Sequence, residues 1–156
     1  MMGRALLIVG WLATLGLVAN VVVGYLLESG DFQPHMLLGL VACLLLLFSH
    51  CWVMFYLIGT GKAIKDVVLE NKLDSDLSER TKAYKNRTYP WLMAAMGLAI
   101  ATFVLGGGYL AGALPSWVHV VLGYATLAVQ VWTLVLEGQV LMQNERLMNE
   151  INQLVA

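Results

Sequence analysis

Long apolar segments alternate with shorter polar ones along the chain. The apolar segments cover residues 5–27, 36–58, 91–114 and 117–136, and each is 20 to 24 residues long. About 20 apolar residues in a helix cross the hydrocarbon core of a bilayer, and a helix satisfies its own backbone hydrogen bonds, which lipid cannot do. The pattern therefore predicts an all-α integral membrane protein in which four transmembrane helices form a bundle.

The composition agrees with a chain surrounded by lipid. Hydrophobic residues make up 60% of the sequence and charged residues 12%, whereas a soluble domain has about 25% charged residues. A water-soluble fold of this size cannot cover so much apolar surface. The net charge of -1 gives no reason to expect a nucleic-acid partner. We expect a single membrane domain over residues 1–156, with the lipid bilayer as its surroundings.

The positive charges predict how the chain is oriented. Arg4 precedes the first span, seven Lys and Arg residues lie within 59–90, and Arg146 follows the fourth span. The connections at 28–35 and 115–116 have no Lys or Arg. Because positive residues stay on the cytoplasmic side during insertion, both termini and the segment 59–90 are expected there. The predicted location is the inner (cytoplasmic) membrane, with a multi-pass topology.

Two of the helices are predicted to continue beyond the membrane. Ile64, Val67 and Val68 keep helical spacing after the second span, and so do Leu147 and Ile151 in the tail, residues 137–156. These two stripes are expected to pack together as a cytoplasmic stalk. Alternatively, the amphipathic tail lies on the lipid surface or binds a cytoplasmic partner. The residues 74–76, Asp-Ser-Asp, are typical of a turn followed by a helix start.

A comparison of the chain with itself at a shift of 84 residues suggests an internal repeat. Residues 24–26, Gly-Tyr-Leu, fall on residues 108–110, and the pattern His-x-x-Leu-Gly that begins at His35 falls on the one that begins at His119. A true duplication would make the protein two tandem helical hairpins related by an axis along the membrane normal. The alternative is a coincidence within apolar sequence.

His35 and His119 are candidate axial ligands of a b-type haem. Each lies near the outer end of an even-numbered span, so both are expected at similar depth, and facing helices can each supply one histidine to a haem or to a smaller metal site. Gly39 and Gly123, one turn further in, would let a flat ring approach the backbone. The His-x-x-Leu-Gly start, five residues in each of the two helices, resembles the haem-bearing helices of membrane cytochromes of the b561 type. The plainer interpretation is a histidine at a helix end that has access to water.

His50 lies about 22 Å further along the second span than His35, in the inner half of the predicted membrane. With Met54, Met93 and Met96 at comparable depth, it could be a second haem ligand or part of a copper site with soft ligands. The favoured interpretation is a neutral imidazole that hydrogen-bonds a hydroxyl or Gln130 between helices.

Glu137 ends the fourth apolar segment and is expected to pair with Lys62 or Lys65. A proton-relay role would require Glu137 to be buried on one path with Gln130 and His50.

Two functions follow from this pattern. The first is a small subunit of a larger membrane complex of the respiratory or photosynthetic electron-transfer type, mainly structural, which packs against other subunits or other copies of itself. The alternative is an electron-transfer subunit that holds haem b between His35 and His119. The sequence has no catalytic motif, so we do not expect a self-sufficient enzyme.

Overall fold

The computed structural model describes residues 2–26 and 32–155 and is helical almost throughout. Its helices are α1 (Met2–Leu26), α2 (Gln33–Glu70), α3 (Asp76–Leu110) and α4 (Ser116–Val155). All four are long and apolar enough to span a membrane. The prediction of four apolar helices is therefore confirmed. Residues 28–31 of the predicted connection lie outside the described residues, and α2 begins at Gln33, before the predicted start at 36.

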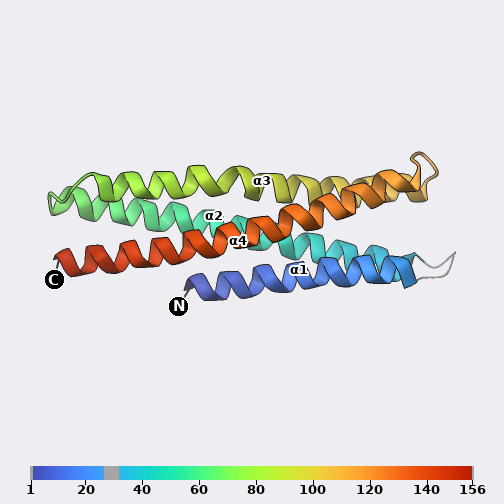
Figure 1. Ribbon diagram of the computed structural model, residues 1–156, viewed down its shortest axis with the longest axis horizontal. Helices are drawn as coiled ribbons and strands as arrows, with labels where there is room; N and C mark the ends of the chain where they lie inside the picture. Colours follow the sequence, from blue (N-terminus) through green and yellow to red (C-terminus); the bar gives the residue numbers. More distant parts are fainter. Residues whose placement is uncertain (1, 27–31, 156) are drawn as a thin grey trace.

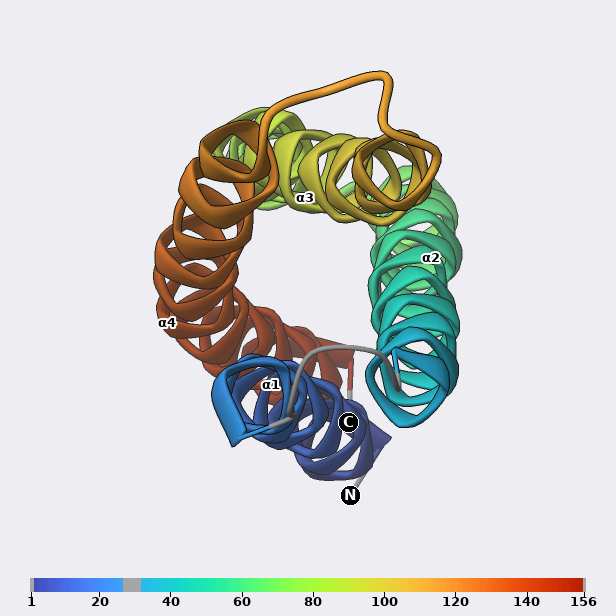
Figure 2. The same ribbon diagram turned by 90° about the vertical axis from the view of Figure 1, so that its right-hand side faces the viewer.

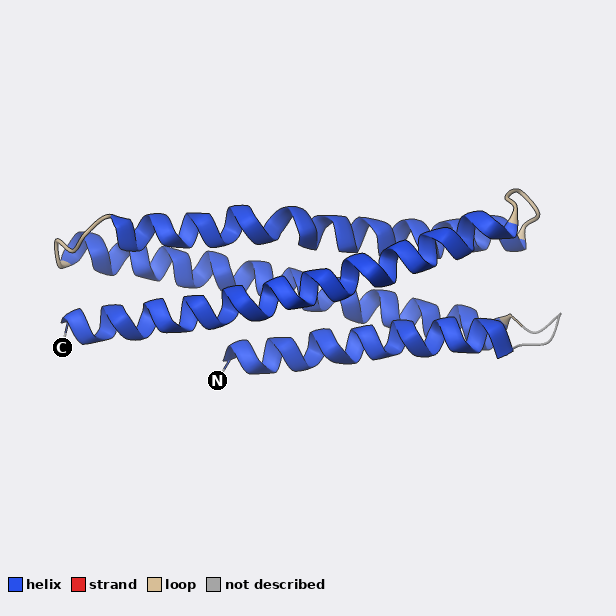
Figure 3. Cartoon of the chain, viewed as in Figure 1, coloured by secondary structure: helices blue, strands red, loops and turns tan. Residues whose placement is uncertain are grey.

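The helices form an up-and-down bundle. Figure 2 shows them around a common axis in the order α1, α2, α3, α4, so α1 and α4 are neighbours and α2 lies across the bundle from α4. Figure 1 shows that α1 is the shortest helix and that the other three continue past its N-terminus. We call this extension, residues 59–70, 76–90 and 142–155, the stalk. The opposite end, where α1 meets α2 and α3 meets α4, is the pocket end (Figure 3).

The stalk differs from the prediction in one respect. Helices α2 and α4 do extend as their helical spacing predicts, but α3 extends as well, because the polar residues that follow Ser75 continue through Pro90 without a break. The backbone N–H of Asp76 donates to Oδ1 of Asp74 at 2.9 Å, a side-chain turn that leads into the helix. The stalk is therefore a three-helix bundle.

The turn between α3 and α4 is longer than predicted. Helix α3 ends at Leu110, before the end of the predicted span at 114, and Gly112 has a φ of 73°. This left-handed conformation costs glycine little, so glycine commonly ends a helix. The backbone N–H groups of Ala111 and Ala113 donate to carbonyls in the last turn of α3.

The interior of the bundle is organised in layers along its axis. Below the pocket end lies an apolar layer that includes Ala13, Leu46 and Met96. A second apolar layer is made by Leu6, Val53, Leu57, Leu92, Val140 and Leu141. The stalk has its own apolar core, made by Ile64, Val68, Leu77, Leu147 and Ile151.

The outside of the bundle is strongly apolar. In the most apolar stretch of each helix only 22% to 33% of the residues are buried, and large side chains such as Trp11, Phe55 and Trp132 are exposed. Soluble monomers rarely expose continuous apolar surface of this extent.

Candidate functional site

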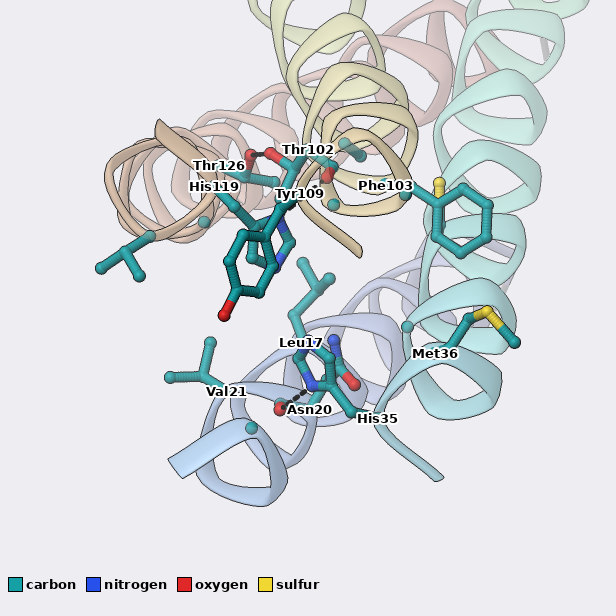
Figure 4. A pocket seen from close by; sticks show the side chains of 18 of the residues that line it. Leu17, Asn20, Val21, His35, Met36, Thr102, Phe103, Tyr109, His119 and Thr126 are labelled. Carbon is teal, nitrogen blue, oxygen red and sulfur yellow. Dashed lines mark hydrogen bonds between the residues drawn. The ribbon is translucent and has the colours of Figure 1, made fainter. Parts of the chain in front are cut away.

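The pocket end of the bundle contains a cavity of about 450 Å³, which we call the histidine pocket. Its lining includes His35 from α2 and His119 from α4, two helices on opposite sides of the bundle (Figure 4). The centroids of the two imidazole rings are 5.9 Å apart and the ring planes are perpendicular, at 89°. Two residues 84 positions apart in the chain are thus neighbours across one cavity.

Each of these imidazoles is hydrogen-bonded to the backbone of a neighbouring helix. Nδ1 of His35 lies 3.0 Å from the carbonyl oxygen of Asn20 on α1. Nδ1 of His119 lies 3.1 Å from the carbonyl oxygen of Thr102 on α3. A carbonyl oxygen only accepts hydrogen bonds, so each Nδ1 is the donor. In a neutral imidazole this leaves a lone pair on Nε2.

On the helix that supplies each carbonyl, a glycine one turn further along leaves room for the imidazole. A methyl group on Gly24 would lie 2.9 Å from Cε1 of His35, and one on Gly106 would lie 2.8 Å from Cε1 of His119. The carbonyls of Asn20 and Thr102 also accept the helical hydrogen bonds of these glycines, since a helix joins residue i to residue i−4. Without a Cβ at that position, the imidazole reaches the carbonyl from the side.

These two contacts revise the register of the internal repeat. Asn20 and Thr102 are 82 residues apart, as are Gly24 and Gly106, whereas the two histidines are 84 apart. The structural counterpart of Gly24 at the pocket is therefore Gly106. The sequence match of residues 24–26 with 108–110, at a shift of 84, does not describe these contacts. From Gly24 to His35 there are 11 positions and from Gly106 to His119 there are 13, so the second hairpin has two more residues between its glycine and its histidine.

The two glycines predicted to let a ring approach differ from one another. Gly123 lines the histidine pocket and has open space where its Cβ would be. Gly39 also lines the pocket, but Asn20 occupies its free side: a methyl group on Gly39 would lie 2.9 Å from Nδ2 of Asn20. The Oδ1 atom of Asn20 is buried and has no hydrogen-bond partner.

A second polar cluster lies deeper in the bundle, below the histidine pocket. Nδ1 of His50 is 2.7 Å from Oε1 of Glu137, and Nε2 of His50 is 2.8 Å from Oε1 of Gln130. Gln130 donates from Nε2 to the hydroxyl of Thr14 at 3.1 Å. These four residues, which we call the His50 network, join α1, α2 and α4 and are at most 3% exposed.

The network confirms one prediction and corrects another. The hydrogen bond between His50 and Gln130 is the one expected for a buried interhelical imidazole. The expected pairing of Glu137 with Lys62 or Lys65 is wrong, because Glu137 is fully buried against His50 and both lysines are exposed. Both ring nitrogens of His50 have partners, so we do not assign it as a ligand of haem or copper.

Two oxygen atoms beside the network lack partners. Oε2 of Glu137 and Oγ of Ser49 are both buried and make no hydrogen bond. A methyl group on Gly10 would lie 3.7 Å from the first and 3.4 Å from the second. Cδ2 of Leu134 would be only 2.6 Å from that methyl group, so a leucine side chain fills the position beside Gly10 and both oxygens lie next to it.

Among residues 2–26 and 32–155, no group of three or more His, Cys, Asp or Glu side chains is placed to hold a metal ion. No protein-family model, curated protein or solved structure matches the chain. The function has to be inferred from the geometry of its own residues.

The spacing of polar residues along α4 is a signal that the prediction did not use. His119, Gly123, Thr126, Gln130, Thr133 and Glu137 follow one another at alternating steps of four and three residues. This spacing keeps residues on one face of a helix. The structure turns this face inward, with Thr126, Gln130, Thr133 and Glu137 buried. Thr14, the α1 member of the network, stands alone in an apolar helix and gives no comparable pattern.

Proposed function

We propose that this chain is a four-span membrane protein that holds a b-type haem between His35 and His119 and transfers electrons. The observation that carries the proposal is the pair of imidazoles 5.9 Å apart, each oriented by a backbone carbonyl. Histidines that bind metals typically donate their other ring N–H to a carbonyl or carboxylate, which fixes the tautomer and the ring orientation. Both pocket histidines have this arrangement.

The separation of the rings suits a single metal ion between them. Bonds from a metal to histidine nitrogens are about 2.0–2.1 Å long. With about 1.15 Å from each nitrogen to its ring centre added on both sides, the centroids would be about 6.3–6.5 Å apart when both Nε2 atoms point at the ion. The centroids in the structure are 5.9 Å apart, so the rings would have to separate slightly to bind it.

A haem fits this site better than a bare metal ion. Zinc sites use three or four protein ligands, but the described residues offer no cluster of three. A haem supplies four nitrogens of its own and needs two axial ligands, as in the cytochromes. The cavity of about 450 Å³ is within the range of cofactor pockets, about 300–1,000 Å³. Gly123 leaves space on the wall formed by α4.

Two axial histidines would leave the iron without an open position. Substrate activation at a metal needs a free coordination site, as at catalytic zinc. A haem coordinated on both faces is therefore suited to taking up and passing on single electrons. The donor and the acceptor would be other subunits or a membrane-soluble carrier, which supports the interpretation as a small subunit of a larger electron-transfer complex.

The proposed orientation places the pocket end on the outer side of the inner membrane. The chain has nine Lys and Arg residues. One of them is Arg4, and the other eight lie in the stalk or in the turn at 71–75. The positive-inside rule then puts both termini and the stalk in the cytoplasm. The exposed apolar surface of the four helices would face lipid or neighbouring subunits.

Spectroscopy of the purified protein tests this proposal. The chain is expressed in haem-replete cells and purified in mild detergent, and its reduced-minus-oxidised absorption spectrum is recorded with a haem assay. We expect the α-band of a low-spin b-type haem, lost in both His35→Gln and His119→Gln. The exposed Cys51→Ala variant, also on α2, serves as the control and should keep its haem.

The opposite outcome points to the second candidate function. A flat spectrum from folded wild-type protein, together with partner proteins purified in a fixed ratio, would exclude the haem and favour a structural subunit. In that case the pocket histidines would act only as hydrogen-bonded contacts between helices.

A further inference from the structure

The directions of the hydrogen bonds from Thr14 through Gln130 to His50 follow from one backbone carbonyl. The hydroxyl of Thr14 donates to the carbonyl oxygen of Gly10 at 2.9 Å. Its oxygen can then accept from Nε2 of Gln130, which leaves Oε1 of Gln130 as an acceptor. Nε2 of His50 must therefore carry a hydrogen. This tautomer is the reverse of that of the two pocket histidines.

The contact between His50 and Glu137 then requires one further proton. Nδ1 and Oε1 are 2.7 Å apart, and without a hydrogen between them a lone pair would face a carboxylate oxygen. With one proton, the pair is either an imidazolium beside a carboxylate or a neutral imidazole beside a carboxylic acid. Both forms have no net charge, which favours them in a dry interior where an uncompensated charge is costly.

The surroundings can also stabilise the pair after this proton leaves. Glu137 would then be an anion, and its Oε2 has no hydrogen-bond partner. The hydroxyl of Ser49, also without a partner, lies near the same point of α1, since a methyl group on Gly10 would be 3.7 Å from Oε2 and 3.4 Å from Oγ. A change in the Ser49 side-chain rotamer would be needed to bring this hydroxyl into contact with the anion, and hydrogen bonds to a charged form stabilise it.

No other charged group is placed to replace the proton. Of the acidic and basic side chains in the described residues, His50 and Glu137 are the two that are fully buried. The network meets Thr14 and Gly10 from α1, Ser49 from α2 and Gln130 from α4, none of which ionises. From α3, the buried residues at this level are Leu92, Ala95 and Met96, and Tyr89 donates its hydroxyl to the carbonyl of Met54.

The network lies between two apolar layers, but on the pocket side α4 contributes the buried hydroxyl of Thr126 beside the layer of Ala13, Leu46 and Met96. On the stalk side lies the apolar layer of Leu6, Val53, Leu57, Leu92, Val140 and Leu141. On the other side, Leu17, Thr126 and Leu127 line the pocket within about one helical turn of Thr14 and Gln130. A polar path towards the pocket continues through Thr126, whose hydroxyl lies 2.7 Å from that of Thr102.

From these observations we infer that His50 and Glu137 form a proton-binding site that exchanges one proton through the histidine pocket. The site takes up a proton from the pocket side and returns it there, since Thr126 supplies a polar group on that side, whereas the layer on the stalk side is apolar. This inference does not rest on the haem, because every group it uses belongs to the chain.

Nuclear magnetic resonance of the protein labelled with [15N]histidine tests it directly. The chain has three histidines, and His35→Gln and His119→Gln variants assign their signals. In wild-type protein we expect Nε2 of His50 to remain protonated, while Nδ1 loses its proton when the buffer pH is raised within the range where the protein stays folded. In Glu137→Gln the titration should be lost. A His50 spectrum that stays constant over the range where wild-type protein is folded would overturn the inference.

A matched pair of threonine variants tests the route. Thr126 and Thr60 each donate to a carbonyl one turn back and each contact a polar side chain of another helix. Thr126 is on the pocket side of the network and Thr60 is in the stalk. Thr126→Val should slow proton exchange at His50 several-fold, and Thr60→Val should leave it unchanged. The reverse result would show that the proton comes from the stalk, against the proposed route.

Discussion

The imidazole ring of His35 occupies the space that a Cβ atom on residue 24 would need. A methyl group on Gly24 would be 2.9 Å from Cε1 of the ring, and the corresponding distance for Gly106 and His119 is 2.8 Å. Real Cβ atoms essentially never approach another heavy atom so closely. The glycines of α1 and α3 therefore determine where the histidines of α2 and α4 lie.

We expect Gly24→Ala and Gly106→Ala to displace these imidazoles and to lower the haem content of the purified protein at least several-fold. The matched control is Gly97→Ala on α3, where a methyl group meets no other atom within 4 Å. That variant should keep its haem and gain about 0.5–1 kcal/mol, because alanine favours the helix over glycine. Equal haem loss in all three variants would mean that the glycines act through helix flexibility instead.

The perpendicular ring planes lead to a spectroscopic prediction for the oxidised protein if it holds the proposed haem. The angle between the planes of His35 and His119 is 89°. Perpendicular axial imidazoles leave the iron d orbitals nearly degenerate, so the low-spin electron paramagnetic resonance signal should be strongly anisotropic. A spectrum typical of parallel ligand planes would show that the rings rotate when haem binds. The helical carbonyls of Asn20 and Thr102 would then not hold the rings in the positions seen here.

The direction of the hydrogen bonds from Gln130 to His50 depends on a single hydroxyl, that of Thr14. Thr14→Val keeps the side-chain volume but removes the group that accepts from Gln130 and donates to Gly10. A buried donor without a partner costs about 1–3 kcal/mol, so we expect a lower melting temperature in detergent. Thr14→Ser restores the hydroxyl and should recover most of the loss. If both variants lose equal stability, the methyl group of Thr14 is what the packing needs.

Much of the fold could be predicted from the sequence because apolar segment length and helical period are local properties. The four helices and the extension of α2 and α4 follow from them directly. The helix start that the sequence indicates at residues 74–76 is confirmed, but residues 77–88 are mostly polar and did not indicate that this helix is a third member of the stalk. In the structure Leu77 and Thr81 face the other two helices of the stalk, and buried contacts of this kind depend on neighbours far along the chain.

The two polar sites differ in how much local sequence could reveal. His35 and His119 were paired because both lie near the same end of an even-numbered helix, and depth can be counted along a helix. Glu137 was assigned to the wrong partner because counting depth does not give the direction in which a side chain points. The spacing of α4 from His119 to Glu137 indicates an inward face, and with it Glu137 belongs with Gln130 and His50. The backbone carbonyls that hold the pocket histidines have no sequence signature.

The stalk should behave as a small apolar core of its own. Leu147 is fully buried between α2, α3 and α4, whereas Leu154, on the same helix, is 57% exposed. Truncation of a buried leucine costs about 2–5 kcal/mol, so Leu147→Ala should make the stalk much more sensitive to limited proteolysis. Leu154→Ala should not. Increased cleavage in Leu154→Ala alone would show that the end of α4 packs against something other than α2 and α3.

The proposed orientation in the membrane can be measured with single cysteines. Cys43→Ser and Cys51→Ser remove the native thiols, and Ser116→Cys or Lys62→Cys then places one thiol at the pocket end or in the stalk, both at exposed positions. In intact cells a membrane-impermeant maleimide should label residue 116 and leave residue 62 unlabelled, and both should react after the cells are broken. Labelling of residue 62 alone in intact cells would reverse the orientation. It would also place the histidine pocket, and the route by which protons reach His50, on the cytoplasmic side.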